Sequence, residues 1–149
     1  YYRATYRDPS RDEMLALALL AAIRGAKGFL FYSYFDQGNP AWDAAARPRR
    51  WADLCRVGQA LRDLESVLLA DAPAPALTLR VREGEVEARA FRDEAGREAV
   101  LLAAIGPGPC RAEVMVEGTY RSRFGKTTAA DGRYVFRGRD VCGDVLVRG

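Results

Sequence analysis

The sequence predicts an α/β region at residues 1–72 followed by an all-β region at residues 76–149. In the first region, apolar residues recur at helical spacing on both sides of a short aromatic segment. In the second region, apolar and polar residues alternate in short runs separated by turn residues, which is typical of an antiparallel β-sandwich or barrel. The spacing changes at residues 73–75, a proline-containing linker that cannot be helical.

Residues 9–25 have the pattern of a buried helix. Ser10 and Glu13 have the spacing of a capping box, in which each residue bonds the other's backbone at the helix start. Gly25 suits the position just after the helix end, where a left-handed backbone is common. Met14 to Ile23 is apolar on nearly every side, so we expect this helix to be packed between layers.

Phe29 to Phe35 predicts a strand because the segment is short and rich in aromatic residues. It lacks polar alternation, which suggests that both faces are covered, as in a parallel sheet. Such a strand needs neighbouring strands, and the first region supplies none. A loop is expected at residues 36–49.

A second helix is predicted from about residue 49 to residue 70. Its apolar residues at three- and four-residue spacing form one stripe, consisting of Trp51, Leu54, Gly58, Leu61, Leu64 and Leu68. We therefore expect Trp51 in the core. Cys55 is expected to be a small buried hydrophobic residue in the same helix.

Seven strands are predicted in the all-β region. Val100–Ile105 has no polar alternation, so we expect it to be central and covered on both faces. The predicted strands are 77–82, 86–90, 100–105, 110–116, 120–124, 134–136 and 141–147. Turn residues separate them, at 83–84, 93–96, 106–109, 118 and 131–132.

Composition excludes several kinds of site. The chain has no histidine, which removes histidine-dependent nucleophilic catalysis and histidine-bound metals from what it does alone. Cys55, Cys110 and Cys142 lie far apart, so no zinc site is expected, and the sequence leaves open whether Cys110 and Cys142 pair. No cofactor is expected. The net charge of +3 comes from arginines interleaved with acids, which gives no reason to expect nucleic acid.

Two further patterns are weaker than they look. The longest apolar run, Met14 to Ile23, is too short to span a bilayer, so no membrane partner is expected. Residues 124–128, Phe-Gly-Lys-Thr-Thr, look like a phosphate-binding loop. However, position 120 is tyrosine where the full pattern needs glycine, and no helix is predicted to follow. We therefore expect no phosphate site there.

The segment Pro9 to Met14, the alanine- and leucine-rich helix after it, and the stretch Gly25 to Tyr34 together resemble the end of a glycoside hydrolase. The resemblance is to (β/α)8-barrel (TIM barrel) enzymes of the β-galactosidase-like kind, in which helix 7 leads through a Gly-Ala-Lys-Gly turn into strand 8. It implies that residues 1–72 are helix 7, strand 8 and helix 8 of a barrel. A β-sandwich often follows in such enzymes, and residues 76–149 match one.

The resemblance also implies that catalysis and structural support belong to different parts of the parent enzyme. Retaining glycosidases use an acid/base carboxyl and a nucleophile carboxyl, and in this family both would precede Tyr1, so no catalytic residue is carried over. The chain alone is expected to be inactive, with the sandwich supporting the barrel. At the end of strand 8, where barrel active sites are built, the candidates for sugar contact are Tyr32, Tyr34, Asp36 and Trp42.

Alternative interpretations stay open for these residues and for the chain. The tyrosines also suit a core, Asp36 a turn, and Trp42 a loop anchor. The expected partner is the remainder of the barrel, or a second copy of the chain in a self-sufficient domain. A different class of function is a non-enzymatic sandwich that binds carbohydrate or a protein. The sugar, its linkage, and whether the parent protein is secreted or periplasmic stay open.

Overall fold

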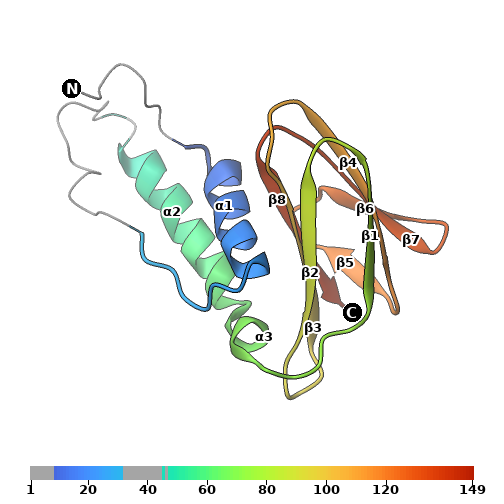
Figure 1. Cartoon of the computed structure of the whole chain (residues 1–149). Coiled ribbons are helices and arrows are strands. Elements are labelled where there is room, and N and C mark those ends of the chain that lie inside the picture. The colour runs from blue at the N-terminus through green and yellow to red at the C-terminus, as the bar shows by residue number, and fades with distance from the viewer. Residues whose placement is uncertain (1–8, 32–44, 46) are drawn as a thin grey trace.

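A computed structural model describes residues 9–31, 45 and 47–149 of the chain. The described part is built of three layers, with helices on one side and two sheets on the other (Figure 1). The helices are α1 (Arg11–Ile23), α2 (Arg47–Arg62) and α3 (Glu65–Leu69). The strands are β1 (Leu77–Glu83), β2 (Val86–Arg92), β3 (Glu98–Ala104), β4 (Pro109–Val116), β5 (Tyr120–Ser122), β6 (Thr127–Ala130), β7 (Arg133–Arg139) and β8 (Cys142–Arg148).

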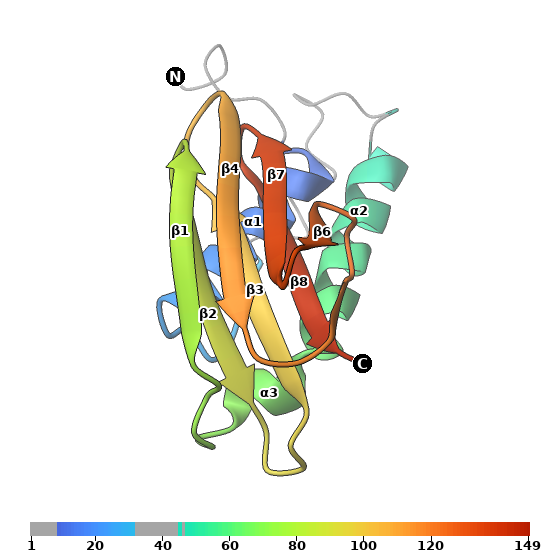
Figure 2. The same cartoon turned by 90° about the vertical axis from the view of Figure 1, so that its right-hand side faces the viewer.

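The strands form two four-stranded antiparallel sheets, as the sequence predicted in outline. The middle sheet has the order β2-β3-β8-β5, and the outer sheet has the order β1-β4-β7-β6. Figure 2 shows the outer sheet in front of the middle sheet, with the helices behind. The chain changes sheet repeatedly, for example between β1 and β2 and between β3 and β4, so the two sheets are interleaved in the sequence.

Two apolar cores hold the three layers together. The sandwich core lies between the sheets and contains Val100, Val114 and Phe136, all fully buried. The helix–sheet core lies between the helices and the opposite face of the middle sheet, and includes Leu19 and Leu101. Every residue of β3 is buried, which confirms the prediction that this strand is covered on both faces.

Both ends of α1 have the predicted capping. The Glu13 backbone N–H donates to Ser10 Oγ at 3.2 Å, and the Ser10 backbone N–H donates to Glu13 Oε2 at 2.7 Å, which completes the capping box. After the helix, Gly25 has φ +106°, and its N–H donates to the Ala22 carbonyl at 3.0 Å. The Ala26 N–H reaches back to the Ala21 carbonyl at 2.9 Å, which completes a Schellman motif.

The predicted strand at residues 29–35 is wrong for the part that the structure describes. Residues 26–31 are not in a strand, and Leu30 is 93% exposed. Residues 32–35 lie outside the described residues. An isolated extended segment has no ladder partner for its backbone groups, so aromatic content alone does not make a strand. The described strands all pair antiparallel, and the barrel unit therefore stays a proposal.

The predicted second helix differs in its end and in its buried face. It stops at Arg62, and α3 starts separately at Glu65. Trp51 is 45% exposed and Cys55 is exposed, so both were wrongly expected to be buried. Leu61, Leu64 and Leu68 of the predicted stripe are buried, and the structure also buries Arg50, Val57, Ala60 and Val67.

Candidate functional site

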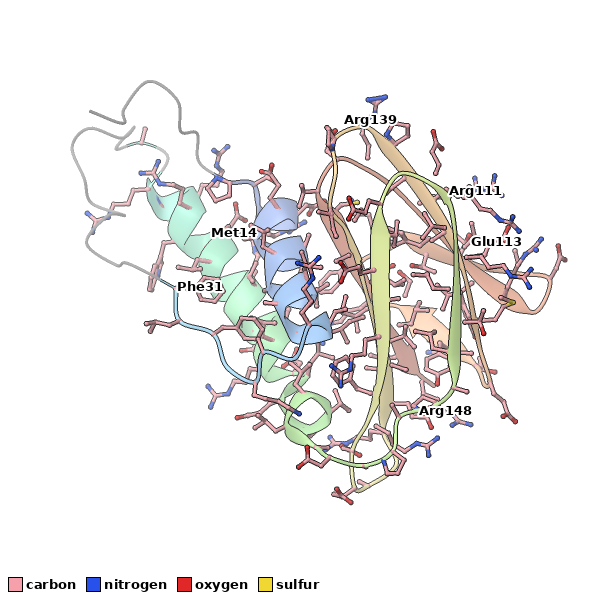
Figure 3. The ribbon with its side chains drawn as sticks, viewed as in Figure 1. Met14, Phe31, Arg111, Glu113, Arg139 and Arg148 are labelled. Carbon is pink, nitrogen blue, oxygen red and sulfur yellow. The ribbon has the colours of Figure 1, made fainter. Side chains whose placement is uncertain are left out.

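The four residues predicted to contact sugar, Tyr32, Tyr34, Asp36 and Trp42, lie outside the described residues, so the structure neither gathers nor separates them. The segment before them can be followed as far as Phe31, which lies on the helical side of the molecule (Figure 3). A shallow cleft of about 300 Å³ adjoins this segment. Its walls are mostly apolar and consist of Lys27, Phe29, Leu61, Arg62, Glu65, Leu68 and Leu69.

Lys27 of the Gly-Ala-Lys-Gly turn has a structural position. Its Nζ donates to the Leu68 carbonyl at 2.8 Å and to the Ala70 carbonyl at 3.4 Å, and it lies 3.9 Å from the Asp71 carboxylate. The last carbonyls of a helix have no partner within the helix, and a lysine can satisfy them. Lys27 therefore fixes the turn after α1 against the end of α3.

A larger cleft of about 470 Å³ lies between the start of α1, α2 and the β5–β6 connection. One ion pair joins its walls, in which Lys126 Nζ contacts Asp12 Oδ2 at 2.8 Å. Arg123, which also lines the cleft, contacts Asp63. The hydrogen bond to Asp12 raises the pKa of Lys126, and burial opposes this to a smaller extent. The cleft offers bound cations and single carboxylates rather than a facing carboxylate pair. It is therefore a seam between layers and not a glycosidase centre.

Asp144 organises the segment that resembled a phosphate loop. Its fully buried carboxylate accepts hydrogen bonds from Ser122 Oγ at 2.6 Å and from the backbone N–H groups of Phe124, Lys126 and Val145 at 2.9, 3.0 and 2.8 Å. A phosphate would need these amides, and Asp144 already uses them. The segment connects β5 to β6 with no helix after it, as the sequence predicted.

A second buried carboxylate, Glu98 on β3, joins four strands. Its Oε1 accepts from Arg92 Nε at 2.8 Å, and its Oε2 accepts from Tyr120 Oη at 2.5 Å and lies 2.8 Å from Arg148. Burial opposes ionisation of Glu98, but these hydrogen bonds outweigh it and hold its pKa below the usual value. Burial and the bond to Glu98 raise the pKa of Tyr120. Because each carboxylate oxygen of Glu98 already accepts a hydrogen bond, the cluster stabilises the fold by joining its strands.

Arginines gather on the exposed face of the outer sheet. In the register, Arg111 lies opposite Arg137, and Arg80 lies opposite Glu113. Figure 3 shows Arg111 and Glu113 on the side of the molecule away from the helices. The arginine face, as we call it, consists of Arg80, Arg82, Arg111, Arg133, Arg137 and Arg139.

Glu113 is the buried centre of the arginine face, only 6% exposed. Its Oε2 lies 3.0 Å from Arg82 and 3.5 Å from Arg133, and the hydrogen bond from Arg82 is the main reason that its pKa is lowered. Sequence reasoning missed this face because arginines and acids are interleaved along the chain. The alternation of polar and apolar residues could have predicted that these arginines face away from the core, since they occupy polar positions of β1, β4 and β7.

The described residues hold neither a metal-binding cluster nor a membrane-spanning helix. Among residues 9–31, 45 and 47–149, no group of three or more cysteine, aspartate or glutamate side chains is placed to hold a metal ion. None of the described helices is long and apolar enough to cross a membrane. No protein-family model, no curated protein and no solved structure matches the chain.

Proposed function

We propose that this chain is the C-terminal portion of a carbohydrate-active, glycoside hydrolase-like protein, in which the sandwich supports the last helices of a (β/α)8 barrel. The catalytic carboxylates lie outside the chain. The main support is the apolar seat of the helices on the middle sheet. Leu19 of α1, Leu101 of β3 and Val145 of β8 all belong to the helix–sheet core and are fully buried.

Helix α1 packs closely against the middle sheet, and Gly143 of β8 makes this close packing possible. A Cβ atom added at this glycine would lie 2.9 Å from the Leu102 carbonyl oxygen, 2.9 Å from Leu19 Cδ1 and 3.3 Å from the Ala16 Cα. Real Cβ atoms essentially never show contacts as short as the first two. The absent side chain therefore lets the helix backbone lie directly on the strand.

Polar contacts tie both ends of α1 to the sandwich. At the start of the helix, Asp12 is bound by Lys126. At its end, Arg24 binds Glu87 of β2 at 2.5 Å, and Arg89 donates to the Ile23 carbonyl at 3.2 Å. A sandwich that contacts one helix along its length and at both ends is suited to stabilising that helix within a larger protein.

The helical region exposes large apolar side chains, as expected of a layer that continues into other elements. Leu17 of α1 is 56% exposed and Phe31 is 41% exposed, and both are large apolar side chains. In a barrel, the last helices and the segment between them pack against the preceding βα units. These side chains are available for that packing.

The experiment that tests the proposal uses the coding region upstream of Tyr1. We expect it to encode further βα units, with a glutamate or aspartate at the end of two of the strands. The full-length protein should hydrolyse a chromogenic glycoside from a panel of sugars, while the present chain shows no turnover on the same panel. An upstream region without βα units, or turnover by the present chain alone, would refute the proposal.

The arginine face supports a second candidate function, a sandwich module that binds an anionic glycan. Guanidinium groups can pair with carboxylates in a two-pronged geometry, and Arg82 already donates one hydrogen bond to the Glu113 carboxylate at 3.0 Å. On this alternative, the chain binds polygalacturonate and not the neutral polymer dextran. The variant Arg111→Glu/Arg137→Glu should abolish that binding, whereas Arg121→Glu, an exposed arginine of the middle sheet, should leave most of it. Equal losses in the two variants would indicate general charge attraction only.

A further inference from the structure

Two buried cysteines face each other across the sandwich. Cys110 lies on β4 of the outer sheet and Cys142 on β8 of the middle sheet, and they are 5% and 2% exposed. Both are free thiols in the structure, and both sulfurs lie beside the same glycine, Gly138 of β7. We propose that Cys110 and Cys142 form a disulfide that joins the two sheets when the chain folds in the presence of a disulfide oxidant.

Gly138 of β7 shows how closely the two sulfurs lie. It is directly opposite Cys110 in the register of β4 and β7. A Cβ atom added at Gly138 would lie 2.2 Å from Cys142 Sγ and 3.2 Å from Cys110 Sγ. Both sulfurs therefore occupy the space that a side chain at this one position would fill.

The backbone does not require glycine at position 138. Seven glycines of the described chain have positive φ, and Gly138 is not among them. Other residues can adopt its conformation, so the crowding by the sulfurs is the feature of the fold that calls for glycine there. This makes the sulfur pair a built feature of the sandwich and not a chance proximity of two small core residues.

The cross-link would add a connection that the fold lacks at this point. β4 and β8 belong to different sheets, so no backbone ladder joins them. Among the described residues no third ligand is placed to complete a metal site with the two sulfurs. A disulfide is the bond that two thiols in contact can make without any further group from the protein.

The reaction balances with a disulfide of low molecular weight, such as oxidised glutathione. The thiolate of one cysteine attacks it, releasing one glutathione thiol and leaving a mixed disulfide. The thiolate of the second cysteine then displaces the other glutathione. Two protein thiols are oxidised and one glutathione disulfide is reduced to two thiols, with no other change.

The pair has to react while the sandwich is still open. Burial, and then the neighbouring Cys142, raise the pKa of Cys110 to about 11, so in the closed, reduced fold little thiolate exists at neutral pH. An outside oxidant also cannot reach the buried sulfurs. Folding in an oxidising medium is therefore the step at which the bond forms, and the exposed Cys55 is left as a free thiol.

The test is oxidative refolding of the whole chain. The protein is unfolded, reduced, and refolded with reduced and oxidised glutathione, after which free thiols are alkylated in denaturant and counted by mass spectrometry. We expect a single alkylated thiol, at Cys55, where the reduced protein has three. We also expect a peptide cross-linked between Cys110 and Cys142. The variant Cys55→Ser should give no alkylated thiol and the same cross-link.

Two results would overturn the proposal. One is recovery of alkylated Cys110 and Cys142 after refolding to the native circular dichroism spectrum. The other is a disulfide between Cys55 and one of the buried cysteines, with no Cys110–Cys142 disulfide formed in the variant Cys55→Ser. Gly138→Ala gives an independent check, since its methyl group would part the sulfurs and lower the yield of the cross-link. Gly106→Ala, where a Cβ would meet nothing within 4 Å, should leave the yield unchanged.

Discussion

Replacing Gly143 by alanine tests how closely α1 is seated on the middle sheet. The added methyl carbon would lie 2.9 Å from the Leu102 carbonyl oxygen, which the β3 ladder holds in place. It would also lie 2.9 Å from Leu19 Cδ1, and Leu19 is fully buried. The substitution can be accommodated only by shifting the helix or the strand.

The size of the effect follows from this crowding. Inserting a methyl group into a well-packed core costs about 1–3 kcal/mol. Since one of the two closest atoms belongs to the backbone, we expect Gly143→Ala to lower the free energy of unfolding by about 2–3 kcal/mol. For a chain of this size that corresponds to a fall in Tm of about 4–12 °C.

The assay is urea unfolding followed by circular dichroism, with Gly58→Ala as the matched control. Gly58 is in α2, and a Cβ there would meet nothing within 4 Å. Alanine at an open helical position should raise the free energy of unfolding by about 0.4–1 kcal/mol. The two glycine substitutions should thus have opposite signs. A Gly143→Ala variant as stable as the parent chain would refute the close seating of the helix.

Three further predictions concern the buried polar groups and the cysteines. Asp144→Ala should lower the free energy of unfolding by about 3–5 kcal/mol in urea, because it leaves buried backbone N–H groups without acceptors; an unchanged midpoint would contradict this. The lowered pKa of Glu98 contributes stability that is fully present above the ordinary carboxyl pKa of 4.5, and this stability is lost as the pH falls through the folded-state pKa. The urea midpoint should therefore drop on acidification below that range, and Glu98→Gln should flatten the drop. Formation of the Cys110–Cys142 bond should raise the free energy of unfolding by about 3–4 kcal/mol, measured with and without reductant, and no difference would contradict it.

The β region could be largely predicted from the sequence because residues within and next to each strand mark where it begins and ends. Alternation marks which residues face a core, and glycines with positive φ end the strands at positions such as Gly84 and Gly118. The turn between β6 and β7 is a further case, since Asp131 and Gly132 both have positive φ. The strand β6 was missed because Thr127–Ala130 is short and has no alternation to detect.

The first region was harder to predict because its structure depends on partners far away in the sequence. Aromatic content at Phe29–Phe31 suggested a strand, but a strand needs a ladder partner, and none of the described strands provides one. On α2, three- and four-residue spacing allowed two stripes, and packing against α1 buried Val57 and not Trp51. For the arginine face, alternation within each strand gave the polar positions, but which strands become neighbours depends on the fold.

The central claim is that the helical layer is held by the sandwich, and native-state hydrogen exchange of α1 tests it most directly. A helix of 13 residues is marginal in water by itself, so lasting protection of its amides must come from packing. We predict that the buried half of α1 exchanges with nearly the same opening free energy as β3, and that Gly143→Ala lowers both. Exchange of α1 at the rate of an isolated helix, with β3 still protected, would contradict the account.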